Sequence, residues 1–150
     1  MAKKLSKIKV SAVKAVGKGG ARASKKKLVM VVDDEPDNIT TVRAVLEANS
    51  FEVVSAVNGD DCLEKLKSVK PDLILMDIMM PGTPVREVVK KIKGTKIAFL
   101  SVVRVSEAEK EDLFVAGNII DFIQKPFDIN ELLEKVNRVI VPMTFYKLKH

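Results

Sequence analysis

The sequence predicts an α/β domain built on a doubly wound, five-stranded parallel sheet flanked by five helices. Three observations support this prediction. Short apolar runs alternate along the chain with segments whose apolar residues recur at helical spacing. The first run, LVMVV at 28–32, is apolar at every position, as expected of a strand buried on both faces. Repeated strand–helix alternation implies parallel pairing, because each crossover returns the chain to the same edge of the sheet.

The predicted strands are short, rich in Val, Ile, Leu or Phe, and bounded by charged or turn-forming residues. They are expected at 28–32, 51–57, 72–77, 96–101 and 119–124.

Each predicted helix follows a strand and carries one apolar face. The first begins at Pro36, whose missing N–H suits the first turn of a helix. The second lies within 58–69, after turn and cap residues, and a short third follows the Pro81-Gly82 turn and the Thr83-Pro84 cap. The fourth spans about 106–116, and the fifth follows Asp128. The apolar faces are Ile39, Val42, Val45 and Leu46; Cys62, Leu63, Leu66 and Val69; Val85, Val88, Val89 and Ile92; and Ile129, Leu132, Leu133, Val136 with Val139 or Ile140.

Charge divides the chain into a basic arm at 1–27, a domain at 28–140 and a short tail at 141–150. The arm holds ten basic residues and no acidic one, whereas the rest holds 16 basic and 20 acidic residues. We expect a flexible or partly helical arm that could contact nucleic acid or an anionic surface. It has no aromatic residue, so such binding should be non-specific and salt-sensitive. A solvated arm without function, or one folded back on the acidic domain, are the alternatives.

Several classes of protein are disfavoured by composition. No apolar run approaches the ~18 to 20 residues of a membrane span. The lysine-rich N-terminus lacks the apolar core of a secretory signal. Cys62 is the only cysteine and His150, the last residue, the only histidine, which argues against a disulfide and against histidine-based catalysis. We therefore expect a cytoplasmic protein.

Chemically useful residues follow four of the predicted strands. Asp33 and Asp34 end the first, Asp77 the third, Ser101 the fourth, and Lys125 follows the fifth. All should meet at the carboxyl edge, where ligands bind in such sheets. Carboxylates without His or Cys suit Mg²⁺, and a carboxylate facing that cation can attack phosphorus. Singly, each residue has an ordinary interpretation, such as a helix cap for Asp33 or Asp34; their joint occurrence favours a site.

The segments VVDDEPDN, LILMDIMMPG, FLS and QKPF resemble, in order, the signature segments of receiver domains of two-component response regulators, in particular stand-alone, chemotaxis-regulator-like ones. The resemblance covers about residues 28 to 140 and implies the flavodoxin-like fold of that family. It implies that Asp77 is the phospho-acceptor and that Asp33, Asp34, Asp77 and the main-chain carbonyl of Met79 hold Mg²⁺. Ser101 would be the switch hydroxyl, Lys125 the phosphate-neutralising lysine, and Phe122 the switch aromatic, although Phe122 alone is equally well explained as core.

The chain departs from the family at three places near the expected phosphate. The stretch after Asp77 is abbreviated, so we expect a short third helix. Val102 stands where the family favours a smaller residue, which could narrow the approach of phosphodonors. Met79 and Val103 are apolar where polar residues can position an attacking water, which leads us to hypothesise slow self-dephosphorylation.

The favoured function is a phosphorylation-dependent switch that catalyses only its own phosphoryl transfer and dephosphorylation. Its phosphodonor would be a histidine kinase or a histidine phosphotransfer protein. Its output would use the face of the fourth helix, fifth strand and fifth helix, for a partner protein or a homodimer. Only ten residues follow the last helix, so no C-terminal effector domain is expected.

Three alternatives stay open. One is a non-phosphorylated scaffold that acts through the basic arm. The second is a Mg²⁺-dependent aspartyl-phosphate phosphatase, although the second acid that such sites want is replaced by Met79. The third is a flavin-binding domain, which would need a Ser, Thr or Gly phosphate loop where DDEPDN stands.

Overall fold

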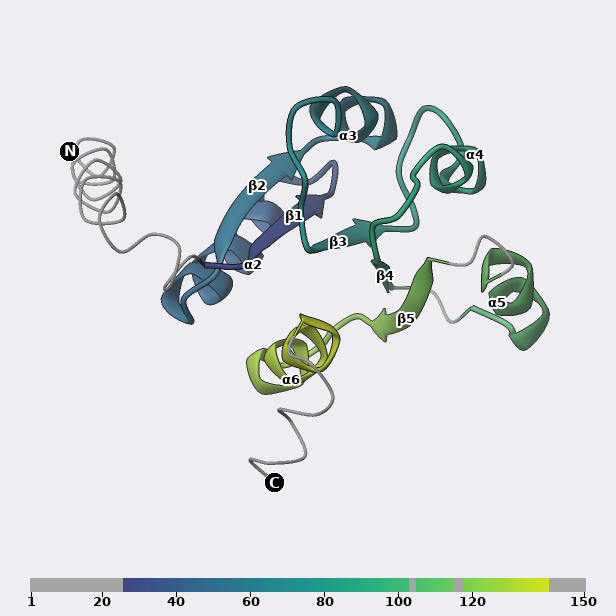
Figure 1. Cartoon of the computed structure of the whole chain (residues 1–150). Helices are drawn as coiled ribbons and strands as arrows, with labels where there is room; N and C mark the ends of the chain where they lie inside the picture. The colour runs from purple at the N-terminus through teal and green to yellow at the C-terminus, as the bar shows by residue number, and fades with distance from the viewer. Residues whose placement is uncertain (1–25, 103–104, 115–117, 141–150) are drawn as a thin grey trace.

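The fold is a five-stranded parallel sheet between two layers of helices (Figure 1), seen in a computed structural model that describes residues 26–102, 105–114 and 118–140. The strands lie side by side in the order β2-β1-β3-β4-β5, and every neighbouring pair is parallel. Their bounds are β1 Leu28–Val32, β2 Glu52–Ala56, β3 Leu73–Asp77, β4 Ile97–Ser101 and β5 Ile119–Gln124. The predicted doubly wound α/β class is thereby confirmed.

Five described helices cover the two faces of the sheet. They are α2 Pro36–Ala48, α3 Gly59–Lys65, α4 Val85–Lys90, α5 Glu107–Phe114 and α6 Ile129–Ile140. Helices α2 and α6 lie on one face, and α3, α4 and α5 lie on the other (Figure 1). Since the strands are covered on both faces, β3 and β4 are buried at every position, as the continuous apolar runs predict.

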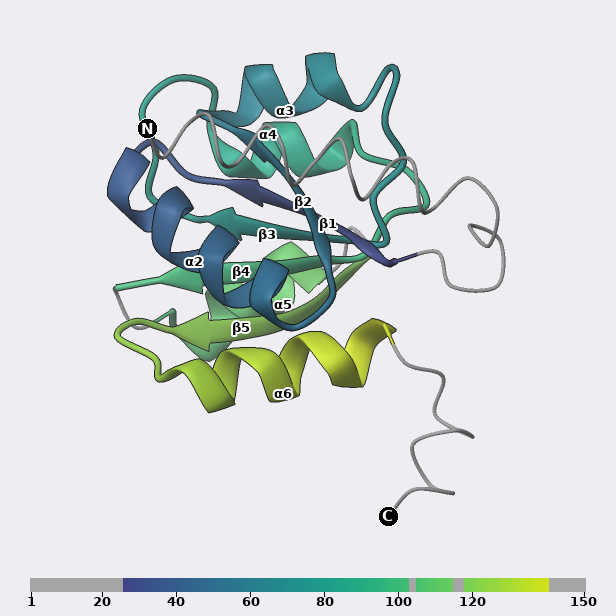
Figure 2. The same ribbon diagram turned by 90° about the vertical axis from the view of Figure 1, so that its left-hand side faces the viewer.

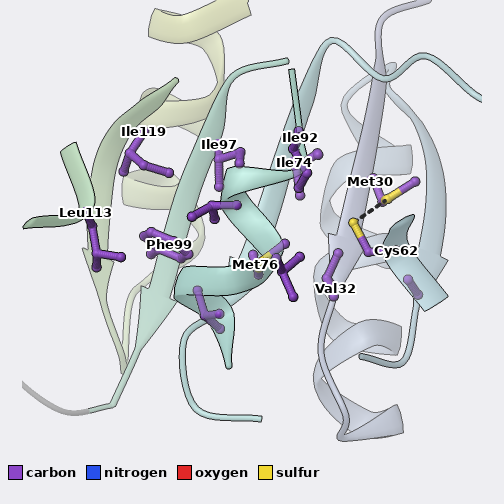
Figure 3. Packing of buried hydrophobic residues seen from close by; sticks show 14 residues of the cluster. Met30, Val32, Cys62, Ile74, Met76, Ile92, Ile97, Phe99, Leu113 and Ile119 are labelled. Atoms are coloured by element: carbon purple, nitrogen blue, oxygen red, sulfur yellow. Dashed lines mark hydrogen bonds between the residues drawn. The ribbon is translucent and has the colours of Figure 1, made fainter. Parts of the chain in front are cut away.

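Alternate residues of each strand pack into two separate cores. Met30 and Val32 face the α3–α4–α5 layer, where Cys62 and Phe99 are also fully buried (Figure 3). Val29 and its alternate neighbours face the α2–α6 layer instead. The Cys62 Sγ lies 3.6 Å from the Met30 Sδ. The period-two alternation of the strand thus assigns each side chain to one core.

The helix bounds differ from the predictions mainly at the C-terminal ends. Helix α3 ends at Lys65 with Leu66 as its C-cap, so Val69 falls beyond it. Pro71 follows closely and disfavours helical backbone at the residue before it. Helix α4 has only six residues, which confirms the predicted short helix. Most of the basic arm, residues 115–117 of the fourth predicted helix region, and the tail lie outside the described residues.

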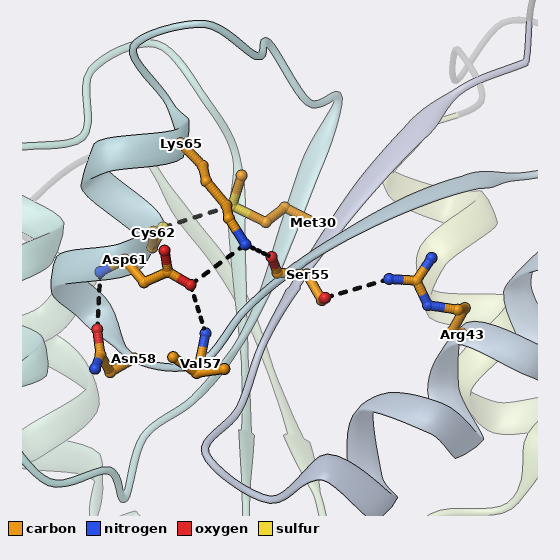
Figure 4. A network of polar contacts seen from close by, with 8 residues as sticks. All are labelled: Met30, Arg43, Ser55, Val57, Asn58, Asp61, Cys62 and Lys65. Carbon is orange, nitrogen blue, oxygen red and sulfur yellow. Dashed lines mark hydrogen bonds and ion pairs between the residues drawn. The ribbon is translucent and has the colours of Figure 1, made fainter.

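The outer edge of β2 is covered by basic side chains. At its two ends β2 bonds the residues that flank β1: the Glu52 N–H donates to the Lys27 carbonyl, and the Ala56 carbonyl accepts the Asp33 N–H. The alternation of a parallel strand then leaves the backbone groups of Val53 and Ser55 facing outward. Arg43 of α2 donates to the Val53 carbonyl at 3.1 Å. Arg43 also donates to the Ser55 hydroxyl at 3.2 Å, and Lys65 of α3 donates to the Ser55 carbonyl at 2.6 Å (Figure 4). These bonds satisfy acceptors that an edge strand otherwise leaves free.

All five strands run in the same direction, so their carboxyl ends meet at one edge (Figure 2). The residues singled out in the sequence lie at this edge.

Candidate functional site

Three carboxylates converge at the carboxyl edge of the sheet. Asp33 and Asp34 follow β1 and Asp77 ends β3, the neighbouring strand. One oxygen from each lies within 4.8 Å of the others. Asp33 is 1% exposed and Asp77 8% exposed, whereas Asp34 is open to solvent. The site therefore has a buried floor and one accessible wall.

The Asp33 carboxylate is held by hydrogen bonds on both oxygens. Its Oδ1 accepts the Glu35 N–H at 2.9 Å, and its Oδ2 accepts the Asn38 side-chain amide at 3.2 Å. Its own N–H donates to the Ala56 carbonyl of β2. Glu35 is the N-cap of α2, so Asp33 also satisfies the backbone just before that helix. The alternative interpretation of Asp33 or Asp34 as the helix cap is wrong, because Glu35 is the N-cap of α2. The Asp33 carboxylate holds the turn just before that helix and lies in the acidic cluster.

Lys125 supplies the positive charge that the acidic cluster requires. Its Nζ lies 3.2 Å from the Asp33 Oδ2 and 3.5 Å from the Asp77 Oδ2. The lysine follows β5, and its N–H donates to the Ser101 carbonyl of β4 at 2.6 Å. The Lys125 side chain is only 13% exposed, so its ion pairs are less screened than those at a surface. One lysine from the edge strand thereby bridges carboxylates of the two central strands.

The surroundings of Asp77 act on the pKa of its carboxyl in opposite directions. Burial raises the pKa of its carboxyl, and the nearby Asp33 charge raises it further; the Met79 N–H, at 2.9 Å from the Asp77 Oδ1, and Lys125 lower it. The net direction is upward, so desolvation outweighs the favourable contacts. A carboxylate held at this cost between a backbone donor and a lysine is typical of a functional site.

Of the other predicted site residues, Ser101, Met79 and Val102 lie at the ends of β3 and β4, whereas Phe122 lies in the core. Ser101, at the end of β4, is 3% exposed. Phe122 of β5 packs against the α3–α4–α5 core, with its ring centroid 5.4 Å from that of Phe99 and 5.6 Å from the Lys110 Nζ. Met79 and Val102 are 59% and 66% exposed at the rim. Val103 lies outside the described residues.

Asn38 is a site contact that the sequence interpretation missed. Its amide holds the Asp33 oxygen that also faces Lys125. The available signal was its place five residues after Asp33, in the first turn of the helix that begins at Pro36. A second missed contact is the Thr83 hydroxyl, which donates to the Asp60 carboxylate and ties the loop after β3 to the start of α3.

The donor set fits a hard divalent cation. The residues that the structure groups as possible ligands are all carboxylates, and oxygen ligands of this kind suit Mg²⁺ better than a transition metal.

Among the described helices, none has the length and apolar character of a membrane span.

Comparison with known families agrees with this geometry. Residues 29–137 match the family described as response regulator receiver domain. Among curated proteins, the chain is 33% identical to chemotaxis protein CheY of Bacillus subtilis and 31% identical to protein PilH of Pseudomonas aeruginosa. Each alignment covers 75% of this chain and 96% of the relative. It is 30% identical to the transcriptional regulatory protein PhoP of Bacillus subtilis over 76% of this chain, but spans only 48% of that protein.

Solved structures show the same similarity in three dimensions. Chemotaxis protein CheY4 of Vibrio cholerae is 28% identical, with a TM-score of 0.71 over 76% of this chain and 98% of that one. Response regulator TrrA of Thermotoga maritima, solved in complex with Mg²⁺-BeF, is 33% identical, with a TM-score of 0.65 over 75% of this chain and 98% of that one.

Proposed function

The chain belongs to the response regulator receiver domain family, and from this premise we propose that it is a phosphorylation-controlled switch of a two-component phosphorelay. Asp77 accepts the phosphoryl group, and the donor is a histidine kinase or a histidine phosphotransfer protein. The observation that carries the proposal is the placement of the buried Asp77 carboxylate beside Asp33, Asp34 and Lys125. Apart from its own phosphoryl transfer and dephosphorylation, the domain acts by binding and not as an enzyme on other substrates.

The transfer is an in-line displacement at phosphorus. An Asp77 oxygen forms the new O–P bond while the N–P bond of a phosphohistidine breaks, and the imidazole leaves with the electron pair. The Met79 N–H fixes the Asp77 Oδ1, which orients the carboxylate. Lys125 offsets the negative charge of the transferred oxygens, and the Ser101 hydroxyl donates a hydrogen bond to one of them. Attack of water later breaks the O–P bond and regenerates Asp77.

Mg²⁺ would be held by Asp33, Asp34, Asp77 and the Met79 carbonyl. When bound, it neutralises charge on the phosphoryl oxygens during the displacement. The mutual repulsion of three carboxylates within 4.8 Å is the feature that makes this site favour a cation.

The rim of the site suits a protein donor. Four exposed large apolar residues are found among the described residues, and all four lie at the carboxyl edge: Val57, Met79, Val102 and Ile129. A helical partner that presents a phosphohistidine would bury them while it aligns the phosphoryl group. Output is assigned to the α5–β5–α6 face, where Phe122 and Lys110 lie together, and the partner there is a downstream protein or a second copy. We place this exchange in the cytoplasm.

The proposal is tested by phosphorylation with a small-molecule donor. The protein is incubated with Mg²⁺ and acetyl phosphate and its intact mass is measured, with Asp77→Ala as the matched variant. We expect one added phosphoryl group that requires Mg²⁺ and is absent from the variant. If no adduct forms and beryllofluoride with Mg²⁺ does not raise the melting temperature, the switch is refuted. A receiver-like scaffold then becomes the better description.

A further inference from the structure

The described charges are sorted between the two edges of the sheet. The site carboxylates Asp33, Asp34 and Asp77 lie where strands end, whereas exposed lysines predominate in the connections that lead into β1, β3 and β4. Two exposed acids, Glu52 and Asp72, also lie at this amino edge, beside the start of β1. We name these residues the amino-edge lysines: Lys27, Lys70, Lys91, Lys93 and Lys96. In Figure 2 this edge is the one at which β1 begins and α6 ends, opposite the carboxylate cluster.

The amino-edge lysines are close together because the strands they precede are neighbours. The Asp72 N–H donates to the Leu28 carbonyl and the Ile74 N–H donates to the Lys96 carbonyl, so the starts of β1, β3 and β4 are in register. Neighbouring strands lie about 4.8 Å apart, so these three starts span about 10 Å. Lys91 and Lys93 extend the group along the loop between α4 and β4.

Helix dipoles and local pairing do not account for this group. Lys65 and Lys90 lie in the last turns of α3 and α4, where a cation is favourable, and each pairs with an acid on its own helix. Lys91 is the C-cap of α4 and is the one amino-edge lysine at a described helix end. The Lys96 Nζ donates to the Val139 carbonyl at 3.5 Å, and no amino-edge lysine forms an ion pair with another described residue. Asp72, the acid nearest in sequence to Lys70, already accepts the Leu28 N–H at 2.8 Å.

We propose that the amino edge of the sheet is a binding surface for the phosphate backbone of double-stranded nucleic acid. Five exposed lysines outnumber the two exposed acids of this edge, Glu52 and Asp72, and leave a compact, net positive patch. A duplex offers about one negative charge per 1.7 Å of its axis. Lysine contacts phosphate as a point charge and without the two-pronged geometry of arginine, so the surface carries no preference for sequence.

Nucleic acid fits this surface better than a lipid bilayer does. Peripheral membrane binding combines basic residues with apolar side chains that enter the bilayer. Among described residues, the large apolar side chains that are exposed all lie at the opposite edge. The patch offers charge alone, which is what a backbone contact requires.

The surface is independent of the phosphorylation chemistry, because the two lie at opposite edges of the sheet. A duplex on the amino edge leaves the carboxylate cluster open to its phosphodonor. The inference therefore stands or falls separately from the proposed switch.

The test compares two triple variants of the full chain that lose the same charge. The edge variant is Lys70→Gln, Lys93→Gln and Lys96→Gln. The matched control is Arg86→Gln, Lys110→Gln and Lys135→Gln, which are basic residues on α4, α5 and α6 away from the amino edge. Both retain the arm, so its contribution cancels. Binding of a short fluorescent DNA duplex of mixed sequence is measured by anisotropy over a series of salt concentrations, and thermal melting confirms folding.

We expect the edge variant to bind more weakly and its slope of log affinity against log salt to be shallower by about 3, with the control near wild type. Unchanged binding by the edge variant would overturn the proposal. Equal losses in both variants would also overturn it, because binding would then follow net charge. Vesicles of phosphatidylcholine and phosphatidylserine supply the third arm: retention of the protein on vesicles but not on DNA would assign the surface to membranes instead.

Discussion

Lys125 occupies the place in the site where its single charge has most effect. It contacts the carboxylates of Asp33 and Asp77 at once, so it partly offsets their repulsion before any cation or phosphoryl group arrives. The Lys125 main chain is held by the Ser101 carbonyl, and the Asp33 carboxylate is held by Asn38 and by the Glu35 N–H. The side chains therefore need little rearrangement when a ligand binds, which is the condition for effective electrostatic stabilisation.

Val102 should control access of small phosphodonors to Asp77. Its side chain is exposed at the rim, at the position after Ser101. We expect Val102→Ala to accelerate phosphorylation by acetyl phosphate several-fold, because the smaller side chain widens the approach, with little change in stability. The rate is measured by intact mass over time. Val57→Ala, a change at another exposed rim residue, is the control; equal acceleration in both would contradict a local gate.

Met79 and Val103 should slow the loss of the phosphoryl group. Both are apolar, so neither can hold a water molecule for attack on the aspartyl phosphate. The double variant Met79→Asn, Val103→Glu is expected to shorten the lifetime of the phosphorylated form about a hundredfold, at the lower end of general acid–base effects. Decay of the phosphorylated mass after removal of the donor checks this. An unchanged lifetime would refute the hypothesis of slow self-dephosphorylation.

Cys62 should make stability fall in alkaline solution. Burial, reinforced by the charge of Asp61, raises the pKa of its thiol from 9.0 to about 12. As the pH rises, the thiol therefore ionises in the unfolded chain before it ionises in the folded one. Its contribution to the free energy of unfolding is fully present below pH 9 and is lost as the pH rises toward 12. At pH 10 the loss is on the order of 1 kcal/mol.

The comparison for Cys62 is with Cys62→Ala, which keeps every other titrating group. Urea unfolding at pH 8 and pH 10 should show the wild type losing more stability than the variant over this interval. Parallel losses would mean that the thiol titrates normally in the folded protein. The buried thiol should also resist a thiol reagent until the chain unfolds.

At the scale of elements, the close approach of α3 and α4 depends on Gly59. A Cβ at this position would clash with the Val88 Cγ2, and Val88 is fully buried. Gly59→Ala should therefore cost about 1 to 3 kcal/mol through overpacking. The double variant Gly59→Ala, Val88→Ala should lose less stability than the sum of the losses in the two single variants, by about 1 kcal/mol or more. Strictly additive losses in denaturant unfolding would contradict the contact.

The sequence predicts elements that depend on local patterns of residues. It does not predict contacts that depend on packing between segments far apart in the chain. Strands β3 and β4 were predictable because complete burial requires an unbroken apolar run. Helix α4 was predictable because its valines recur at helical spacing after a turn, although no side chain caps it and the Thr83 hydroxyl bonds Asp60 instead. The end of α3 was missed, because the apolar spacing continues to Val69 although the helix stops at Lys65. The fit of Gly59 against Val88 is a matter of tenths of an ångström, which spacing does not encode.

The same division applies to the site. Parallel strands bring their ends to one edge, so the rule for doubly wound sheets was enough to gather Asp33, Asp77, Ser101 and Lys125. The bridging position of Lys125 and the amide of Asn38 depend on side-chain reach between elements that are far apart in the chain. Such contacts are set by packing and become visible only in three dimensions.

At the scale of the whole molecule, Mg²⁺ should stabilise the fold. The cluster exists only when β1 and β3 are paired, so the cation binds the folded chain and not the unfolded one. At a Mg²⁺ concentration about a hundred times its Kd, this binding raises the free energy of unfolding by about 2.7 kcal/mol. Thermal melting with and without Mg²⁺ measures the shift. Asp33→Asn should remove it, and a shift of equal size in that variant would exclude the carboxylate cluster as the binding site.

Asp77→Asn should separate the effect of the Asp77 charge on stability from the effect of Mg²⁺ binding. Without Mg²⁺ we expect the variant to melt higher than wild type at neutral pH, because burial disfavours the ionised Asp77 carboxyl and raises its pKa. The gap should narrow on acidification, since a protonated carboxyl no longer carries that cost. A variant that melts lower at every pH would show that the contacts of Asp77 outweigh its desolvation.

The covered edge of β2 has a consequence for how this protein can fail. Amyloid growth and strand-addition inhibitors both work by extending a sheet along free backbone acceptors, one rung after another. Along β2 an incoming segment would have to displace Arg43 and Lys65 from the Val53 and Ser55 carbonyls before its first rung could form. We therefore expect that neither fibril seeds nor designed strand mimetics add a strand to the outer edge of β2. Engineering that removes either side chain should be judged by aggregation as well as by stability.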